Sequence, residues 1–65
     1  MKRYFNVTYH HGGDVYCANI AHAENPDAVS KHYGARYDWV SVGKECSEWE
    51  IKDAIRRGKP IVEID

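Results

Sequence analysis

The sequence contains no leucine, and most of its large apolar side chains are instead valine, isoleucine, tyrosine or tryptophan. β-Branched and aromatic side chains of this kind suit a pleated sheet that is buried on one face. Long apolar runs are also lacking, because no stretch approaches the about twenty residues that a membrane-spanning helix needs. Residues 1–4 lack the apolar character of a signal peptide. We therefore expect a cytoplasmic protein with no membrane segment.

An excess of charge of one sign is absent as well. Nine lysine and arginine residues stand against ten aspartate and glutamate residues, and the formal net charge is −1. No overall electric field therefore draws the chain onto nucleic acid or anionic lipid. The only cysteines are Cys17 and Cys46, and without an export signal we expect both to be free thiols in a reducing compartment.

The composition that remains is sufficient for one small domain over residues 1–65. An apolar content of 43% excludes intrinsic disorder. A chain of this length buries only about 60% of the surface that its unfolded form exposes, so its stability should be marginal.

The first 21 residues predict a β-hairpin. Phe5, Val7 and Tyr9 alternate with polar side chains, as in a strand with one buried face. Gly12 and Gly13 favour a two-residue hairpin turn. Such a turn pairs Tyr9 with Tyr16, Val7 with Ala18 and Phe5 with Ile20 on one face. The opposite face then carries Tyr4, Asn6, Thr8, His10, Val15, Cys17, Asn19 and Ala21.

A short helix follows the hairpin. Asn25 is a strong N-cap, Pro26 suits the first helical position, and Asp27 favours the positive end of the helix dipole. Gly34 predicts a left-handed helix end, so the helix spans about residues 26–33. The apolar face of this helix carries Ala28, Val29 and either His32 or Tyr33.

The remaining segments predict a strand, a second helix and a last strand. In the strand over residues 37–44, we expect Val40 and Val42 on one face and Tyr37, Trp39 and Ser41 on the other. Ser47 and Glu50 form a capping box. The helix that it opens buries Ile51, Ala54 and Ile55 and ends at Gly58, and residues 61–64 form the final strand.

These elements predict an α+β fold, a small β-β-α-β-α-β domain. We expect a four-stranded mixed sheet with two helices on one face. The other face of the sheet then has nothing in this chain to cover it. The strand order stays open.

The histidines and cysteines do not predict a metal site, a cofactor or an enzyme. Zinc ligands usually come as close pairs in sequence, whereas Cys17 and Cys46 are far apart and His10 and His11 point to opposite faces of a strand. His10 and Cys17 are expected to be diagonal neighbours on the open face. Cys17 nevertheless lies in mid-strand, without the pocket or oxyanion hole that a catalytic thiol needs.

The second helix carries its charges in an order that complements the helix dipole. Acidic residues stand at its start and basic residues at its end, and Glu48–Lys52 and Asp53–Arg57 are spaced for ion pairs. The same basic residues, Arg56, Arg57 and Lys59, form a secondary spot that could contact a phosphate backbone.

The two tryptophans point away from the expected core. Trp39 alternates with Val40 and Val42, and Trp49 lies roughly opposite Ile51 on the helical wheel. Exposed tryptophan is typical of interfaces. Whether Trp49 is exposed or caps a corner of the core stays open.

Three features give the chain a resemblance to a group of small bacterial proteins. They are the strand–Gly-Gly–strand hairpin, the helix start at residues 23–28, and residues 48–51 together with residues 58–64. In these the chain resembles small uncharacterised proteins carried on bacterial mobile elements. The resemblance implies a bacterial cytoplasmic accessory protein and assigns no functional residue.

The leading hypothesis is a non-enzymatic protein-interaction or regulatory module that binds a protein partner, which could be a second copy in a homodimer. Its interaction face comprises Tyr4, Asn6, Thr8, Cys17, Asn19 and Trp39. The alternative is a single-stranded nucleic-acid binder that stacks bases on Tyr4 and Trp39 and uses the basic spot for phosphate contacts. The near-zero net charge argues against nucleic acid as the partner.

Overall fold

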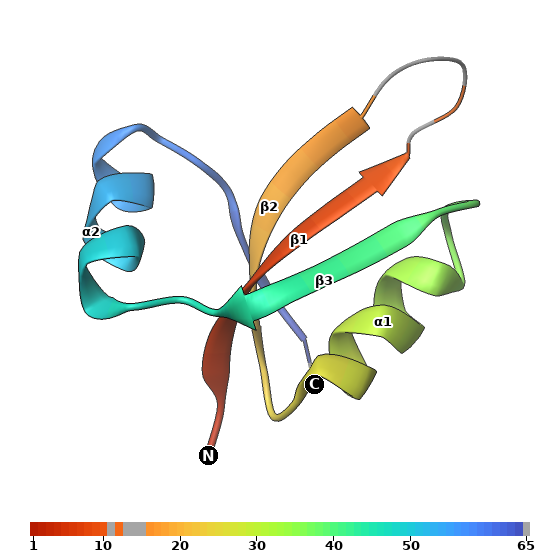
Figure 1. Cartoon of the computed structure of the whole chain (residues 1–65), viewed down its shortest axis with the longest axis horizontal. Coiled ribbons are helices and arrows are strands. Elements are labelled where there is room, and N and C mark those ends of the chain that lie inside the picture. The colour runs from red at the N-terminus through yellow and green to blue at the C-terminus, as the bar shows by residue number, and fades with distance from the viewer. Residues whose placement is uncertain (11, 13–15, 65) are drawn as a thin grey trace.

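A computed structural model describes residues 1–10, 12 and 16–64 of the chain. Its elements are β1 (Arg3–His10), β2 (Tyr16–Ala23), α1 (Pro26–Gly34), β3 (Val40–Glu45), α2 (Glu48–Arg56) and β4 (Ile61–Glu63) (Figure 1). The order of elements, β-β-α-β-α-β, is the one that the sequence predicts.

The four strands form one mixed sheet in the order β3-β1-β2-β4. β1 pairs antiparallel with both β2 and β3, whereas β4 pairs parallel with β2. The structure therefore confirms the small α+β domain with a four-stranded mixed sheet, and it supplies the strand order that the sequence left open.

Two separate apolar clusters occupy opposite faces of the sheet. The larger one packs against α1 and consists of Phe5, Val7, Ala21, Ala23, Val29, Tyr33 and Ile64. The smaller one packs against α2 and consists of Ile20, Cys46 and Ala54, flanked by Tyr4 and Ile51. Because Tyr4 and Phe5 are neighbours in one strand, their side chains point to opposite faces. The prediction that both helices cover one face is therefore wrong.

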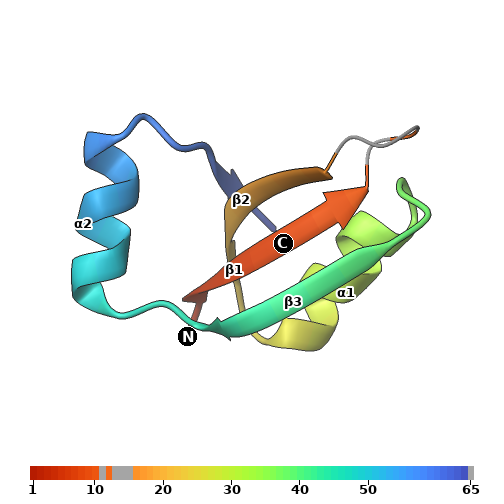
Figure 2. The same ribbon diagram turned by 45° about the horizontal axis from the view of Figure 1, so that its top comes forward.

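The strand order explains why the helices part. The connection through α1 leads from β2 across β1 to β3, and the connection through α2 leads back from β3 to β4. Each joins two parallel strands, and such crossovers are nearly always right-handed. Two crossovers of the same hand that run in opposite directions must lie on opposite faces. In Figures 1 and 2, α1 lies along β3, whereas α2 stands to one side of the sheet.

The register of the first hairpin differs by one residue from the predicted one. Phe5 pairs with Ala21, Val7 with Asn19 and Tyr9 with Cys17. Ile20 therefore faces α2 and not the same side as Phe5. The prediction relied on a two-residue turn at Gly12 and Gly13. Gly12 has a φ of 92°, but Gly13 and Val15 lie outside the described residues.

The alternation of apolar and polar residues along β2 could not reveal this error in register, because both faces of β2 carry apolar side chains. Ile20 is 1% exposed on one face, and Ala21 is fully buried on the other. A slip by one residue exchanges the two faces of a strand without leaving either of them polar.

The helix starts follow the sequence closely. The Asn25 side chain accepts a hydrogen bond from the Ala28 backbone N–H at 2.9 Å. In the capping box of α2, Ser47 Oγ accepts from the Glu50 N–H at 3.2 Å, and Glu50 Oε1 accepts from the Ser47 N–H at 3.0 Å. Gly58 has a φ of 72° just after α2, as expected of a glycine that ends a helix.

Two other boundaries differ from the predicted ones. Gly34 belongs to α1, which ends with Ala35 in a right-handed conformation, so the left-handed end at Gly34 is wrong. β3 begins at Val40, and Tyr37 precedes it with its ring 4.3 Å from that of Tyr9. Tyr37 therefore packs on the α1 face beside Val40 and Val42, whose shared face was predicted correctly.

Candidate functional site

The predicted interaction face is divided between the two sides of the sheet. Tyr4, Asn6 and Thr8 lie on the side of α2, but Cys17 and Asn19 pair with Tyr9 and Val7 and face α1. The cause is the one-residue shift in register, which moves every side chain of β2 to the other face. The six residues therefore do not form one surface.

Three members of that predicted set are engaged within the chain. The ring of Tyr4 stacks on His22, with centroids 4.3 Å apart and planes 17° from parallel. Asn6 Nδ2 donates to Glu50 Oε2 of α2 at 3.3 Å. Asn19 Nδ2 donates to the hydroxyl oxygens of Tyr9 and Tyr33 at 3.1 and 3.3 Å. These contacts stabilise the fold and leave little of the three side chains for a partner.

No described helix or strand covers one half of the α2-side face. We call it the open half-face; it consists of Thr8, His10, Tyr16, Ala18, Trp39 and Ser41. The register places them together, since Thr8 pairs with both Ala18 and Ser41, and His10 pairs with Tyr16. The His10 N–H donates to the Trp39 carbonyl oxygen at 3.0 Å, which extends the ladder to Trp39.

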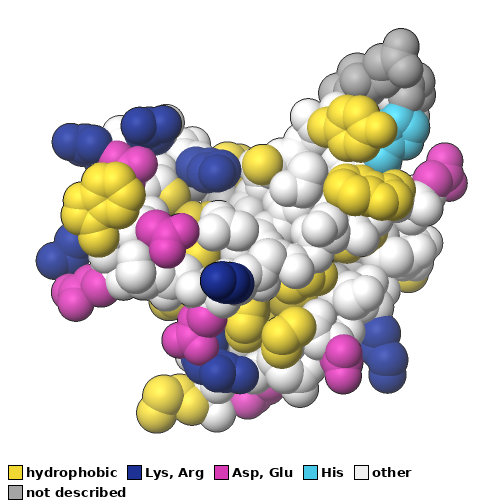
Figure 3. Space-filling model, viewed as in Figure 1, with side chains coloured by type: hydrophobic (Ala, Val, Ile, Leu, Met, Phe, Trp, Pro, Cys, Tyr) yellow, Lys and Arg dark blue, Asp and Glu magenta, His cyan; other side chains and the backbone are white. Residues whose placement is uncertain are grey.

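Three aromatic rings gather at the end of the open half-face. Tyr16 and Trp39 meet edge to face, with centroids 5.7 Å apart and planes at 87°. The rings of His10 and Tyr16 are 5.0 Å apart. Tyr16 is 64% exposed and Trp39 is 48% exposed. Figure 3 shows hydrophobic side chains beside a histidine at the ends of β1 and β2, next to a surface that is largely uncharged.

Sequence reasoning selected Trp39 and missed Tyr16. Tyr16 was assigned to the buried face together with Tyr9, whereas its true pairing partner is His10. One feature of the sequence could have placed Tyr16 on the exposed face, namely the polar character of His10, which lies opposite it. An exposed tyrosine opposite a histidine is as consistent with the alternation of β1 as a buried one opposite Tyr9.

The secondary basic spot is partly neutralised within α2. Arg56 Nη2 lies 2.5 Å from Asp53 Oδ1, and Arg57 Nε lies 3.1 Å from Asp53 Oδ2. Glu48 and Lys52 also pair, at 3.2 Å, so both predicted i,i+4 ion pairs are confirmed. This helix stands at the far end of the sheet from the arrowhead of β1 (Figure 1).

α2 contacts the sheet with only a narrow side. Ala54 is buried, but Ile55 is 60% exposed, so its predicted burial is wrong. Trp49, whose position the sequence left open, is 70% exposed. Because α2 stands beside the sheet, only the stripe with Ile51 and Ala54 reaches the smaller apolar cluster.

His10 and Cys17 do not lie together as a His–Cys pair would. Cys17 faces α1 and His10 faces the opposite side, so their predicted proximity is wrong. Cys46 is buried, and this burial, followed by the charge of Glu50, raises the pKa of its thiol. Both thiols are free. Within residues 1–10, 12 and 16–64, no cluster of His, Cys, Asp or Glu side chains could hold a metal ion; His11 lies outside this set.

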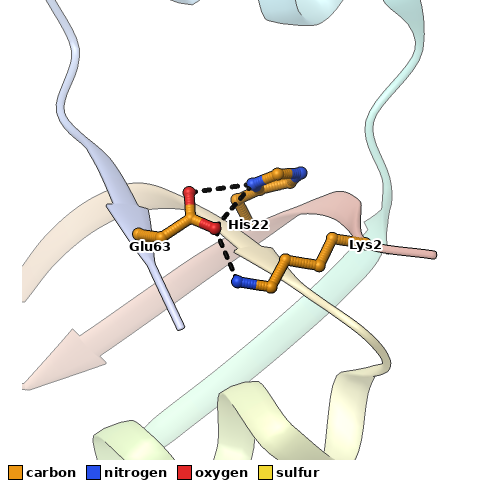
Figure 4. A network of polar contacts seen from close by, with 3 residues as sticks. All are labelled: Lys2, His22 and Glu63. Atoms are coloured by element: carbon orange, nitrogen blue, oxygen red, sulfur yellow. Dashed lines mark hydrogen bonds and ion pairs between the residues drawn. The ribbon is translucent and has the colours of Figure 1, made fainter. Parts of the chain in front are cut away.

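A polar network that the sequence did not suggest joins β4 to the rest of the sheet (Figure 4). Glu63 Oε1 lies 2.6 Å from Lys2 Nζ, and Glu63 Oε2 lies 2.9 Å from His22 Nδ1. The hydrogen bond from Lys2, followed by that with His22, lowers the pKa of Glu63. The network connects the first and last segments of the chain.

The comparisons with known proteins add no family to these observations. No family model, no curated protein and no solved structure matches the chain. The resemblance to proteins of bacterial mobile elements stays a prediction. In the described part of the chain, no helix is both long enough and apolar enough to cross a membrane.

Proposed function

We propose that the protein is a small non-enzymatic interaction module that binds a partner protein through the open half-face. The observation that carries this proposal is the edge-to-face pair of Tyr16 and Trp39, 64% and 48% exposed. Tryptophan and tyrosine are the side chains that most often dominate the energy of a protein interface. Two such rings, already packed against each other, lose little conformational freedom when a partner covers them.

The chemistry around the rings also supports a protein partner. With His10 neutral, none of the six residues of the open half-face carries a formal charge. The centre of a protein interface is typically depleted of charge, because drying an ion without pairing it costs free energy. Hydroxyl groups of Thr8, Tyr16 and Ser41 can hydrogen-bond a partner at little desolvation cost.

The structure offers less support for the nucleic-acid alternative. Tyr4, one of its two stacking rings, is packed on His22, and two cations of its basic spot pair with Asp53. The basic spot also lies at the end of α2 and just after it, and α2 stands at the far end of the sheet from the arrowhead of β1 (Figure 1). For the cellular setting, we propose the bacterial cytoplasm, where Cys17 and Cys46 would stay reduced.

The test compares two double variants that introduce the same charges. Tyr16→Lys with Trp39→Glu alters the open half-face, and Ile55→Lys with Trp49→Glu alters exposed apolar positions of α2. We expect the first pair to abolish capture of partner proteins from an extract of native cells, and the second pair to retain it. Circular dichroism confirms that each variant is folded.

Two results would overturn this proposal. The first is a folded Tyr16→Lys, Trp39→Glu variant that retains every association of the wild type. The second is salt-dependent binding of mixed single-stranded oligonucleotides by the wild type, lost in this variant, which would favour the nucleic-acid alternative.

A further inference from the structure

β3 is an edge strand whose outer side has no paired strand among the described residues. We infer that two copies of this chain pair through the outer edges of their β3 strands, antiparallel and about a two-fold axis. The two sheets then form one continuous eight-stranded sheet. The pairing uses the outer backbone groups of β3, whereas the proposed function uses the side chains of the open half-face, which has Trp39 and Ser41 in common with this edge; the inference therefore goes beyond the proposed function.

The hydrogen bonds of the inner side show which backbone groups are free for this pairing. The Trp39 carbonyl oxygen accepts from the His10 N–H, so the backbone groups of Trp39 face β1. Backbone direction alternates along a strand. The groups of Ser41 therefore also face β1, whereas the N–H and C=O groups of Val40 and Val42 face outward.

The first part of this edge lacks the usual protection against strand pairing, whereas Lys44 and a bulge protect its end. Sheet edges that stay single typically carry lysine, proline or an inward-pointing charge. Residues 40–43, Val-Ser-Val-Gly, contain none of these. A bulge shifts the register between Val42 and Glu45 and confines regular pairing to the stretch before it. The unprotected stretch is therefore short but suited to a second strand.

Two antiparallel copies of β3 are complementary to each other when the two-fold axis passes through Ser41. In that register, Val40 of each copy lies opposite Val42 of the other, and their outward N–H and C=O groups form four backbone hydrogen bonds. Val40 and Val42 are only partly buried, at the rim of the larger apolar cluster. The second copy would cover both, and this burial favours association.

The flanking positions of the same register also match. Trp39 lies opposite Gly43 of the second copy, and glycine leaves space for the indole beside the pairing strands. A side chain at position 43 would contact Asn6 at 3.4 Å. By symmetry the contact of Trp39 with Gly43 occurs twice, so a second copy fits this edge in shape.

The first test places a charge on the axis. Ser41→Lys brings two ammonium groups opposite each other across the interface, and we expect the dimer dissociation constant to rise roughly ten-fold or more. Ser30→Lys, at an exposed position of α1, is the matched control and should leave it unchanged. Sedimentation equilibrium measures the constant from the 7.5 kDa chain and its dimer.

The second test examines the register. Hydrogen exchange of the backbone amides of β3 reports which of them the second copy covers. As the protein concentration rises, exchange at Val40 and Val42 should slow, whereas the Ser41 amide, already bonded to β1, should not change.

Three outcomes would overturn the inference: a monomer up to millimolar concentration, a dimer with unchanged exchange at Val40 and Val42, or a dimer insensitive to Ser41→Lys. Tyr16→Lys separates this inference from the proposed function. It should abolish partner binding through the open half-face and leave the β3 dimer intact. A dimer that Tyr16→Lys dissolves and Ser41→Lys does not would place the second copy on the open half-face instead.

Discussion

Val7 and Thr8 are adjacent in β1 and differ sharply in environment. Val7 is 1% exposed in the larger apolar cluster, whereas Thr8 lies on the open half-face. The alternation of β1 was read correctly from the sequence, because its inward residues are apolar and its outward ones polar. For β2 the same reasoning failed, and with it the assignment of Cys17 and Asn19.

This difference makes a direct prediction for two aspartate variants. Val7→Asp should unfold the protein, because a buried unpaired carboxylate costs several kcal/mol and a chain of this size has roughly 3–10 kcal/mol in total. Thr8→Asp should stay folded, since its carboxylate remains in water. Thermal unfolding followed by circular dichroism measures both. Equal melting temperatures would show that the faces of β1 are wrongly assigned.

At the scale of the element, the signals for helix starts were reliable, whereas those for the helix end at Gly34, the buried stripe of α2 and the long-range arrangement were not. The Asn25 cap and the Ser47–Glu50 capping box depend on residues three positions apart, and the structure shows both. The hairpin register depends on the loop between β1 and β2, and the placement of the helices depends on strand order. No short stretch of sequence encodes either of these.

The capping box allows a quantitative prediction for α2. Ser47→Ala removes the hydroxyl that accepts from the Glu50 N–H, and we expect the free energy of unfolding to fall by about 1 kcal/mol. Ser30→Ala, at an exposed position within α1, is the control and should cause little change or a slight gain, because alanine favours helix. Chemical denaturation measures both. No loss for Ser47→Ala would mean that the start of α2 contributes nothing to global stability.

At the scale of the whole molecule, the two proposed surfaces would act together. A two-fold axis through Ser41, perpendicular to the sheet, keeps the open half-faces of both copies on the same side of the extended sheet. A dimer would then present two aromatic clusters in one direction. Such an arrangement could engage two sites of one partner at once, and the second contact would form at a high effective concentration.

The response of the whole molecule to acid provides the last prediction. Hydrogen bonds from the Ser47 backbone N–H, from the Ser47 side chain and from Asn6 lower the pKa of Glu50, and bonds with Lys2 and His22 lower the pKa of Glu63. Both carboxyl groups therefore bind protons more readily in the unfolded chain, where their ordinary pKa is 4.5. The stability that they contribute is present above that value and is lost as pH falls through their lowered folded-state pKa.

The Glu50→Gln, Glu63→Gln variant tests this directly, because glutamine keeps the capping box possible while removing both titrations. Near neutral pH the variant should be less stable than the wild type, and the two should converge as pH falls below the ordinary carboxyl pKa of 4.5 and through the lowered folded-state pKa of each group. Urea unfolding at a series of pH values measures the difference. Parallel curves would show that neither carboxylate is stabilised by its folded-state partners, and the network that joins β4 to Lys2 would then have no energetic role.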